Sequence, residues 1–498
     1  MDLLAHALKL LELKSISEEG DEELVNYLIP LFEQIGARLV LQQVPHSMGD
    51  HAKRQYNLIG ILGDDLVDSR TKKGLLLTSH VDTASPGNAA DWNKLGGNPW
   101  APALLEGGVY GLGAASGKLD FLCKLIAGAT YAKHGLKQPI YIVATCGGES
   151  PLAGCKYLIQ SGAVNPKYVL VGAPTGLNIV NAQKVQMSFA IRISFVAVER
   201  DAQEFNAKIF VSSRSKSCHV AHPKAEKNAL SNVLFFLDQL RASPIQHKLF
   251  SLHGASSLNK TPDNASAGVV VPSKDLDAVR DRFRSISSNH RDCFFEMRLG
   301  GTGDRGIRLL PAEVAQAVVA IREELDQLNG DLASHHEEGF DPPRSKITFS
   351  GVSQGRDCLD LLLHFHLVPE FGGADIKKEL EADLKARLAK IVHNYRTISI
   401  DCRRLISTPK FYTDPKSTFV QTLCADLASS GVEPIVRSSN NCSEAAYFSE
   451  RGYETVAFGA GQDEDNMNCP NEQVRLDDLH ASIRFYERAI EAFCVRGI

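Results

Sequence analysis

The chain has 498 residues, of which 44% are hydrophobic and 23% are charged, and its formal net charge is −5. This length exceeds what one ordinary hydrophobic core supports, so we expect two or more domains of ordinary globular composition. No segment concentrates Lys and Arg into a long basic face, which argues against nucleic acid or an anionic membrane as a partner. No apolar run reaches the roughly 18 residues that a membrane-spanning helix needs.

The N-terminus and the cysteines both favour a cytoplasmic protein. The segment 1–23 has helical apolar spacing, but it lacks the basic start, the unbroken apolar run and the cleavage site of a signal peptide. The eleven cysteines are scattered, odd in number and without a CxxC pair. Reduced thiols are therefore expected rather than a disulfide framework.

Residues 1–183 alternate helical and strand patterns. Apolar runs that end in polar residues, as buried strands do when they deliver side chains to a site, lie at 74–82, 139–149 and 168–176. Helical spacing covers 120–134 and 152–161, and a helix followed by the start of a strand fits 24–40. Strands that alternate with helices predict an α/β sheet with its chemistry at the carboxyl ends of the strands.

The pattern of predicted strands and helices changes near residue 184, and the first pattern returns near residue 409. Strand patterns at 189–198, 293–299 and 397–405 alternate with helical runs at 227–240, 311–328 and 377–391. This pattern indicates an α+β insert rather than a continuation of the parallel sheet. From residue 414 a helix, a strand and a final amphipathic helix follow the α/β pattern of residues 1–183. We therefore expect one main domain, made of 1–183 and 409–498, that is split by an inserted domain at 184–408.

Five motifs follow strand ends or occupy loops on either side of the insert. They are SHVDT (79–83), EGGVYGLGAASGKLD (106–120), TCGGESPLAG (145–154), GAPT (172–175) and NCPNE (468–472). Their order resembles one family, the co-catalytic di-zinc hydrolases that include acetylornithine deacetylase, succinyl-diaminopimelate desuccinylase, aminoacylase and glutamate carboxypeptidase. The resemblance covers nearly the whole chain. It implies a zinc-peptidase-like α/β sandwich with an inserted α+β lid of the dimerisation type.

Several residues match functional positions of this family. The resemblance implies that His80 is a zinc ligand and that Asp82 orients its imidazole, while Glu149 is a carboxylate ligand of the second metal. His219, in the motif at 217–230, matches the lid His that supports the oxyanion. Glu444 keeps the acidic character of the substrate-binding loop.

At four other positions of the family pattern, this sequence lacks the metal ligand or the general base. The bridging Asp of the family falls on Ser116, the general base on Gly148, a carboxylate ligand on Ala173 and a His ligand on Asn468. A neutral hydroxyl cannot bridge two zinc ions, a methyl group has no donor atom and an amide holds zinc poorly. Without the base, nothing takes the proton of the attacking water. The substrate-binding loop has also lost its Arg, which falls on Ala446.

These losses lead us to expect a pseudoenzyme, with a binding or regulatory role on the hydrolase scaffold and no cofactor. Without zinc, several carboxylates in one cleft would repel and desolvate one another, so the missing acids and a missing metal imply each other. The expected ligand is a small amino-acid or peptide-like molecule.

Two further hypotheses stay open. The first is an active zinc-dependent amide hydrolase, a deacylase, dipeptidase or carboxypeptidase, with a remodelled site in which Cys469 joins His80 and Glu149 as a thiolate ligand. The second is metal-independent chemistry that uses Cys146 or His219. For assembly, the resemblance allows either a homodimer through the lid or a monomer with a doubled lid.

Overall fold

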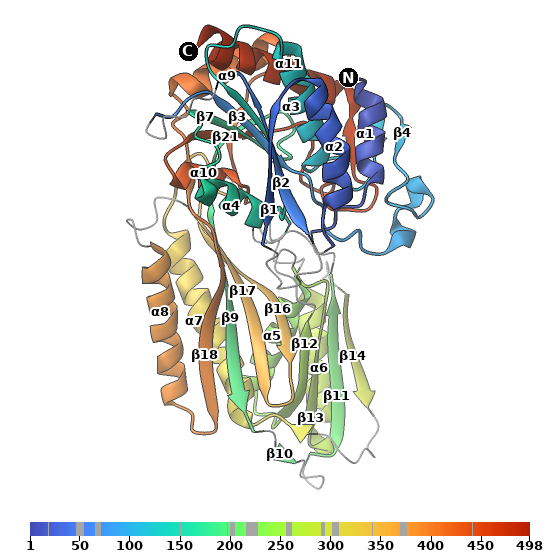
Figure 1. Ribbon diagram of the computed structural model, residues 1–498. Coiled ribbons are helices and arrows are strands. Elements are labelled where there is room, and N and C mark those ends of the chain that lie inside the picture. The colour runs from blue at the N-terminus through green and yellow to red at the C-terminus, as the bar shows by residue number, and fades with distance from the viewer. Residues whose placement is uncertain are drawn as a thin grey trace. The chain divides into compact units, whose positions relative to one another are not determined.

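A computed structural model describes residues 1–17, 19–45, 54–64, 71–149, 152–196, 198–199, 205–215, 228–254, 261–289, 294–300, 308–340, 342–368, 376–440 and 442–498. The chain divides into two compact units (Figure 1). The first unit consists of Met1–Gln183 and Pro409–Ile498, and the inserted unit is Lys184–Thr408.

The first unit is built on a nine-stranded sheet. Its strand order is β1-β2-β6-β3-β7-β21-β8-β19, and β20 pairs with β8. The central neighbours β6, β3, β7 and β21 run parallel, whereas β1 and β2 add an antiparallel edge. The strands are β1 (Arg38–Val44), β2 (Gln55–Leu62), β3 (Leu75–His80), β6 (Ile140–Thr145), β7 (Tyr168–Gly172), β8 (Ile179–Gln183), β19 (Phe411–Tyr412), β20 (Val436–Ser439) and β21 (Glu454–Phe458).

Helices cover both faces of this sheet (Figure 1). Successive side chains of a strand point to opposite faces, so Leu75 and Leu77 enter one apolar core while Leu76 enters the other. The α/β fold class predicted from the sequence is confirmed. The helices are α1 (Leu3–Glu12), α2 (Glu22–Gln34), α3 (Lys118–Tyr131), α4 (Ala153–Ser161), α9 (Thr418–Ser429), α10 (Ala445–Glu450) and α11 (Leu476–Ile490).

A small three-stranded sheet joins two distant parts of the first unit. Strand β5 (Gly108–Tyr110) lies between β4 (Ala103–Leu105) and β22 (Gln473–Arg475). This pairing brings the loop before α3 beside the loop before α11, although more than 350 residues separate them in the chain. Two of the five motifs are thus held together by backbone pairing.

The inserted unit is an eight-stranded antiparallel sheet packed against helices. The strand order is β14-β11-β13-β12-β16-β17-β9-β18. The strands are β9 (Val185–Phe195), β11 (Ala207–Arg214), β12 (Lys248–Gly254), β13 (Asn264–Val271), β14 (Phe294–Gly300), β16 (Lys346–Gln354), β17 (Cys358–Leu367) and β18 (Ile398–Ser407). The helices are α5 (Ala229–Arg241), α6 (Leu276–Asn289), α7 (Ala312–Ala333) and α8 (Ile376–His393).

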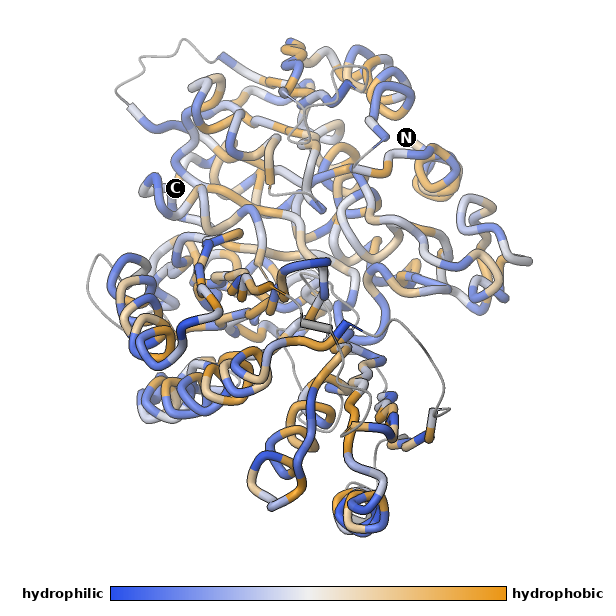
Figure 2. The backbone as a smooth tube through the Cα atoms, turned by 90° about the horizontal axis from the view of Figure 1, so that it is seen from below, coloured by the Kyte–Doolittle hydropathy of each residue, from blue (hydrophilic) through white to orange (hydrophobic). Residues whose placement is uncertain are grey.

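Amphipathic spacing explains how these helices pack. In α8 the apolar residues Leu380, Leu384, Leu388 and Ile391 recur at helical intervals and enter the core of the inserted unit. Hydrophobic and hydrophilic residues alternate along the helical coils in Figure 2. No helix in the described ranges is long and apolar enough to cross a membrane.

The inserted unit contains one structural motif twice. The elements β11-α5-β12-β13-α6-β14 form a βαββαβ motif, and β9, α7, β16, β17, α8 and β18 repeat it. The first copy lies, in sequence, between the first strand and the first helix of the second. The copies meet at equivalent strands, β12 and β16, so the strand order reads as a mirror image about that junction. The doubled motif matches the doubled arrangement that the resemblance allows, and the action of this unit as a lid stays a prediction. The homodimer stays a prediction.

Candidate active site

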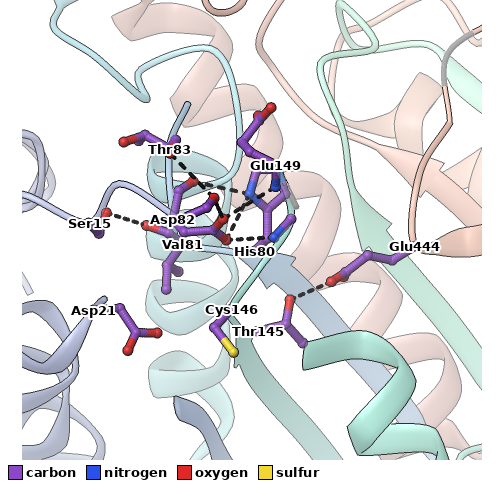
Figure 3. A network of polar contacts seen from close by, with 12 residues as sticks. Ser15, Asp21, His80, Val81, Asp82, Thr83, Thr145, Cys146, Glu149 and Glu444 are labelled. Atoms are coloured by element: carbon purple, nitrogen blue, oxygen red, sulfur yellow. Dashed lines mark hydrogen bonds and ion pairs between the residues drawn. The ribbon is translucent and has the colours of Figure 1, made fainter. Parts of the chain in front are cut away.

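The candidate site lies where the parallel strands of the first unit end. His80 is the last residue of β3 and pairs in register with Thr145, the last residue of the neighbouring β6. The carboxyl ends of parallel strands meet at one edge of a sheet, and the loops that follow them converge there. Figure 3 shows the side chains of His80, Asp82, Thr145, Glu149 and Glu444 gathered at this edge.

His80 and Asp82 form a close pair. The Nδ1 atom of His80 lies 3.1 Å from the Asp82 carbonyl oxygen and 3.4 Å from Asp82 Oδ1. Burial lowers the pKa of His80, but the hydrogen bond and the negative charge of Asp82 outweigh burial and raise it to about 10. For Asp82 burial acts in the opposite direction and raises the pKa. The hydrogen bond and charge of His80 outweigh burial, so the Asp82 pKa lies below its ordinary value.

Asp82 also fixes the loop that follows β6. It is buried and accepts hydrogen bonds from the backbone N–H groups of Gly148, at 2.9 Å, and Glu149, at 3.3 Å. The hydroxyl of Ser17 donates a further hydrogen bond to the same carboxylate. Asp82 thus contacts both the imidazole of His80 and the backbone of the turn at residues 148–149, and the orienting role that the resemblance implies for it stays a prediction.

The imidazole of His80 occupies the space that a side chain at position 148 would need. A Cβ atom built on Gly148 would lie 2.2 Å from His80 Cγ and 2.4 Å from His80 Nδ1. Contacts this short cannot exist without displacement of the ring. The absence of a base at Gly148 and the position of His80 are therefore linked.

Restoring the acid at this position is expected to destabilise the first unit. Gly148→Glu should displace His80 and cost about 1–3 kcal/mol of unfolding free energy, the usual range for overpacking. Gly135→Glu is the matched control, because a Cβ atom on exposed Gly135 meets nothing within 4 Å. Urea unfolding of both variants measures the difference, and equal stabilities would show that His80 moves aside without cost.

Glu149 is bound by the residue that replaces the His ligand of the family. The side-chain amide of Asn468 donates to Glu149 Oε1 at 3.0 Å. Asn468 has a left-handed backbone with φ of 57°, a conformation that Asn tolerates better than most residues. Its Oδ1 atom is buried and has no hydrogen-bond partner among the described residues. The amide therefore makes a hydrogen bond where the resemblance implies a metal ligand.

Glu472 holds the loop that carries Ser116. Its fully buried carboxylate accepts hydrogen bonds from the backbone N–H groups of Gly113, Ala115 and Ser116, at 3.1, 2.8 and 3.1 Å. Burial raises the pKa of Glu472 to about 7, although these three hydrogen bonds act in the opposite direction. The Ser116 hydroxyl is buried without a partner in the described part of the chain.

Asp120 does not take the place of the lost bridging acid. Its carboxylate lies 2.7 Å from Lys124 Nζ, accepts from Ser79 Oγ at 2.7 Å and accepts from the Tyr486 hydroxyl at 2.6 Å. Sequence reasoning missed Lys124 and Tyr486. The signal that it could have used for Lys124 is a Lys four residues after an Asp in a helix that is largely apolar.

Glu444 is the acidic residue of the loop before α10. It is 2% exposed, and its Oε1 atom accepts from Thr145 Oγ1 at 2.6 Å. Burial raises its pKa, and the His80 charge and the Thr145 hydrogen bond only partly oppose this effect. Ala446 is fully buried two residues later, and Ala173 follows β7 with no donor atom in its side chain.

The described residues do not fit a two-zinc centre. They contain no group of three or more His, Cys, Asp or Glu side chains that could hold a metal ion. The proposed thiolate site of His80, Glu149 and Cys469 is therefore not assembled. Cys146 is buried beside Asn57, and burial raises the pKa of its thiol far above the ordinary value, which disfavours a reactive thiolate. His219 lies outside the described residues.

The motif order is matched by one family model. The model named Peptidase family M20/M25/M40 covers residues 76–492, which is most of the chain. The chain belongs to this family. The resemblance to the aminoacylase and carboxypeptidase type of hydrolase is thereby confirmed.

Relatives of this M20-family protein are named as enzymes. It is 32% identical over 176 residues to acetylornithine deacetylase from Photorhabdus laumondii, and 32% identical over 178 residues to the enzyme of the same name from Proteus mirabilis. These matches cover 35% and 36% of this chain and 42% of each relative, so the chain matches less than half of each relative's length.

Solved structures share the fold over nearly the whole chain. An aminoacylhistidine dipeptidase from Vibrio alginolyticus has a TM-score of 0.68 at 14% identity and covers 98% of this chain and 96% of its own. A metallo-carboxypeptidase of the M20 family from Sulfolobus solfataricus has a TM-score of 0.59 at 18% identity and covers 99% of both chains. Identities this low show the fold alone.

The prediction of a pseudoenzyme is wrong by these comparisons, because the relatives are named as deacetylases and peptidases. The active-hydrolase alternative fits them better. The error has a physical reason. The missing metal ligands and base exclude the family's usual arrangement of catalytic groups, but they do not exclude hydrolysis by a different arrangement. We also expected no cofactor. The comparisons do not support this expectation, because the family includes a metallo-carboxypeptidase.

Proposed function

We propose that this M20-family protein hydrolyses an amide bond in a small N-acylated amino acid or peptide. The observation that carries the proposal is the convergence of His80, Glu149 and Glu444 at the carboxyl ends of neighbouring parallel strands. Ligands of open α/β sheets bind at such an edge. The names of the relatives support the reaction class, and the shared fold supports the place.

In this proposal each residue has a separate task. His80 and Glu149 contact the amide group that is cleaved, and Asp82 positions both through the imidazole and the backbone at 148–149. Asn468 orients the Glu149 carboxylate through its amide hydrogen bond. In this proposal the substrate lies against the loop that Glu472 holds through the backbone of Gly113, Ala115 and Ser116.

A substrate panel with matched variants tests the proposal. The purified full chain is incubated with N-acetyl amino acids and dipeptides, with a chelator or with added zinc, and the released amino acid is measured. We expect turnover that His80→Ala lowers by about 100-fold or more, the usual scale for loss of a catalytic side chain. His480→Ala is the control, since His480 lies exposed on α11. No hydrolysis under any metal condition, or equal rates in the two variants, would refute the proposal.

A further inference from the structure

A short segment that follows α1 runs beside the loop that follows β3. Ile16 and Thr83 form a parallel bridge. The backbone N–H of Thr83 donates to the Ser15 carbonyl oxygen at 2.8 Å, and the backbone N–H of Ser17 donates to the Thr83 carbonyl oxygen at 3.0 Å. The hydroxyl of Ser15 donates to the Val81 carbonyl oxygen at 2.9 Å (Figure 3). These contacts align the segment with the loop through backbone groups of the loop.

Two buried side chains from elsewhere in the first unit also hold this segment. The side-chain amide of Gln55 donates to the Ser17 carbonyl oxygen. The Nζ atom of Lys118 donates to the carbonyl oxygens of Leu13, at 2.7 Å, and Leu10, at 3.2 Å. Gln55 and Lys118 are each 1% exposed. The backbone of Ser17 is therefore held without help from its own hydroxyl, and a hydroxyl on a fixed backbone can in turn fix the group that it contacts.

The Ser17 hydroxyl supplies one oxygen of the Asp82 carboxylate with its main donor. Asp82 is 1% exposed. Its Oδ1 atom accepts from the backbone N–H of Gly148 at 2.9 Å and lies 3.4 Å from Nδ1 of His80. Its Oδ2 atom accepts from the Ser17 hydroxyl and, at 3.3 Å, from the backbone N–H of Glu149. A distance of 3.3 Å is long for an N–H···O hydrogen bond, so this buried oxygen would keep only a weak donor without the hydroxyl.

We propose that Ser17 is a positioning residue of the site. Its hydroxyl fixes the rotation of the Asp82 carboxylate, and Asp82 in turn fixes the His80 ring and the backbone at 148–149. This inference rests on the proposed function, in which His80 and Glu149 contact the amide that is cleaved. Removal of one hydroxyl is therefore expected to displace two catalytic groups at once, with little effect on the binding of the substrate.

Two alanine variants of the same segment test this role in the full chain. Ser17→Ala removes the hydroxyl that contacts the Asp82 carboxylate, whereas Ser15→Ala removes another buried hydroxyl that contacts only a backbone carbonyl. On an amide that the unaltered chain hydrolyses, Ser17→Ala should lower kcat by about 10- to 100-fold with KM nearly unchanged, the usual scale for loss of a group that orients a catalytic residue. Ser15→Ala should keep most of kcat, and Ser17→Thr, which retains a hydroxyl, should recover most of the loss. Equal kcat values in the two alanine variants, or a change confined to KM, would overturn the inference.

Amide hydrogen exchange measures the positioning without any turnover. The N–H groups of Gly148 and Glu149 donate to Asp82, so their exchange in the intact chain reports whether the carboxylate keeps its place. Ser17→Ala should speed this exchange by about 2- to 10-fold relative to Ser15→Ala, the effect of one lost hydrogen bond. Equal exchange in the two variants would overturn the inference, whether or not the protein hydrolyses an amide. Faster exchange in a protein that hydrolyses no amide would refute the proposed function and support the positioning contact.

Discussion

Lys124→Met is expected to lower the free energy of unfolding of the first unit by about 3–5 kcal/mol, the range for breaking a buried ion pair from one side. Lys124 is fully buried, and its Nζ atom lies 2.7 Å from Asp120 Oδ2. Burial lowers the pKa of Lys124, and the charge of Asp120 opposes this effect. Without the cation, the Asp120 carboxylate stays in the core, where Ser79 and Tyr486 still donate hydroxyl hydrogen bonds to it.

Tryptophan fluorescence during urea unfolding reports this change selectively. The chain has two tryptophans, Trp92 and Trp100, and both belong to the first unit. Lys9→Met is the control, because Lys9 pairs with Glu12 at 3.1 Å while both side chains are about half exposed. An exposed pair contributes about 0–1 kcal/mol. Equal losses of unfolding free energy in the two variants would mean that the Asp120–Lys124 pair does not stabilise the contact between α3 and the end of β3.

Much of the fold could be predicted from the sequence because burial leaves a regular trace. The run Leu75–Leu77 is apolar at every position, since both faces of a central strand are covered, and its strand β3 ends at His80 where the chain reaches the site. In the inserted unit, Leu380, Leu384 and Leu388 show the helical interval of a helix packed on one face. The sequence left open whether the inserted unit is doubled, because the first copy of the βαββαβ motif separates β9 from the rest of the second copy.

The contacts that define the site could not be predicted, because they join residues that are far apart in the chain. Asn468 and Glu149 are 319 residues apart, and the motif pattern says only that a His is missing at Asn468. Comparison with a family pattern identifies a missing metal ligand but not the hydrogen bond that takes its place. The same limit applies to Gly148, whose missing side chain leaves the space that His80 occupies.

Glu472→Ala is the second substitution with a large expected effect, a loss of about 3–5 kcal/mol in unfolding free energy. The substitution leaves three buried N–H groups, those of Gly113, Ala115 and Ser116, without an acceptor. Each unsatisfied buried donor costs about 1–3 kcal/mol, and partial relaxation of the loop reduces the sum. Glu433→Ala, at an exposed position, is the control and should change stability by about 0.5 kcal/mol or less. Tryptophan fluorescence again measures the first unit.

The pH dependence of Glu472→Gln separates the carboxylate from the loop that it holds. The folded pKa of Glu472, about 7, lies above its ordinary value because of burial. A group shifted in this direction contributes stability below its ordinary pKa, and this contribution is lost as the pH rises through the folded pKa. The stability advantage of Glu472 over Gln should therefore shrink between about pH 5 and about pH 8. Titrating groups that do not interact with Glu472 are common to both proteins and cancel in the difference. Lys118 is coupled to Glu472, because burial lowers the pKa of Lys118 to about 7 and the charge of Glu472 opposes this effect. A difference that stays constant with pH would mean that Glu472 keeps one protonation state and that its three N–H donors outweigh the effect of burial.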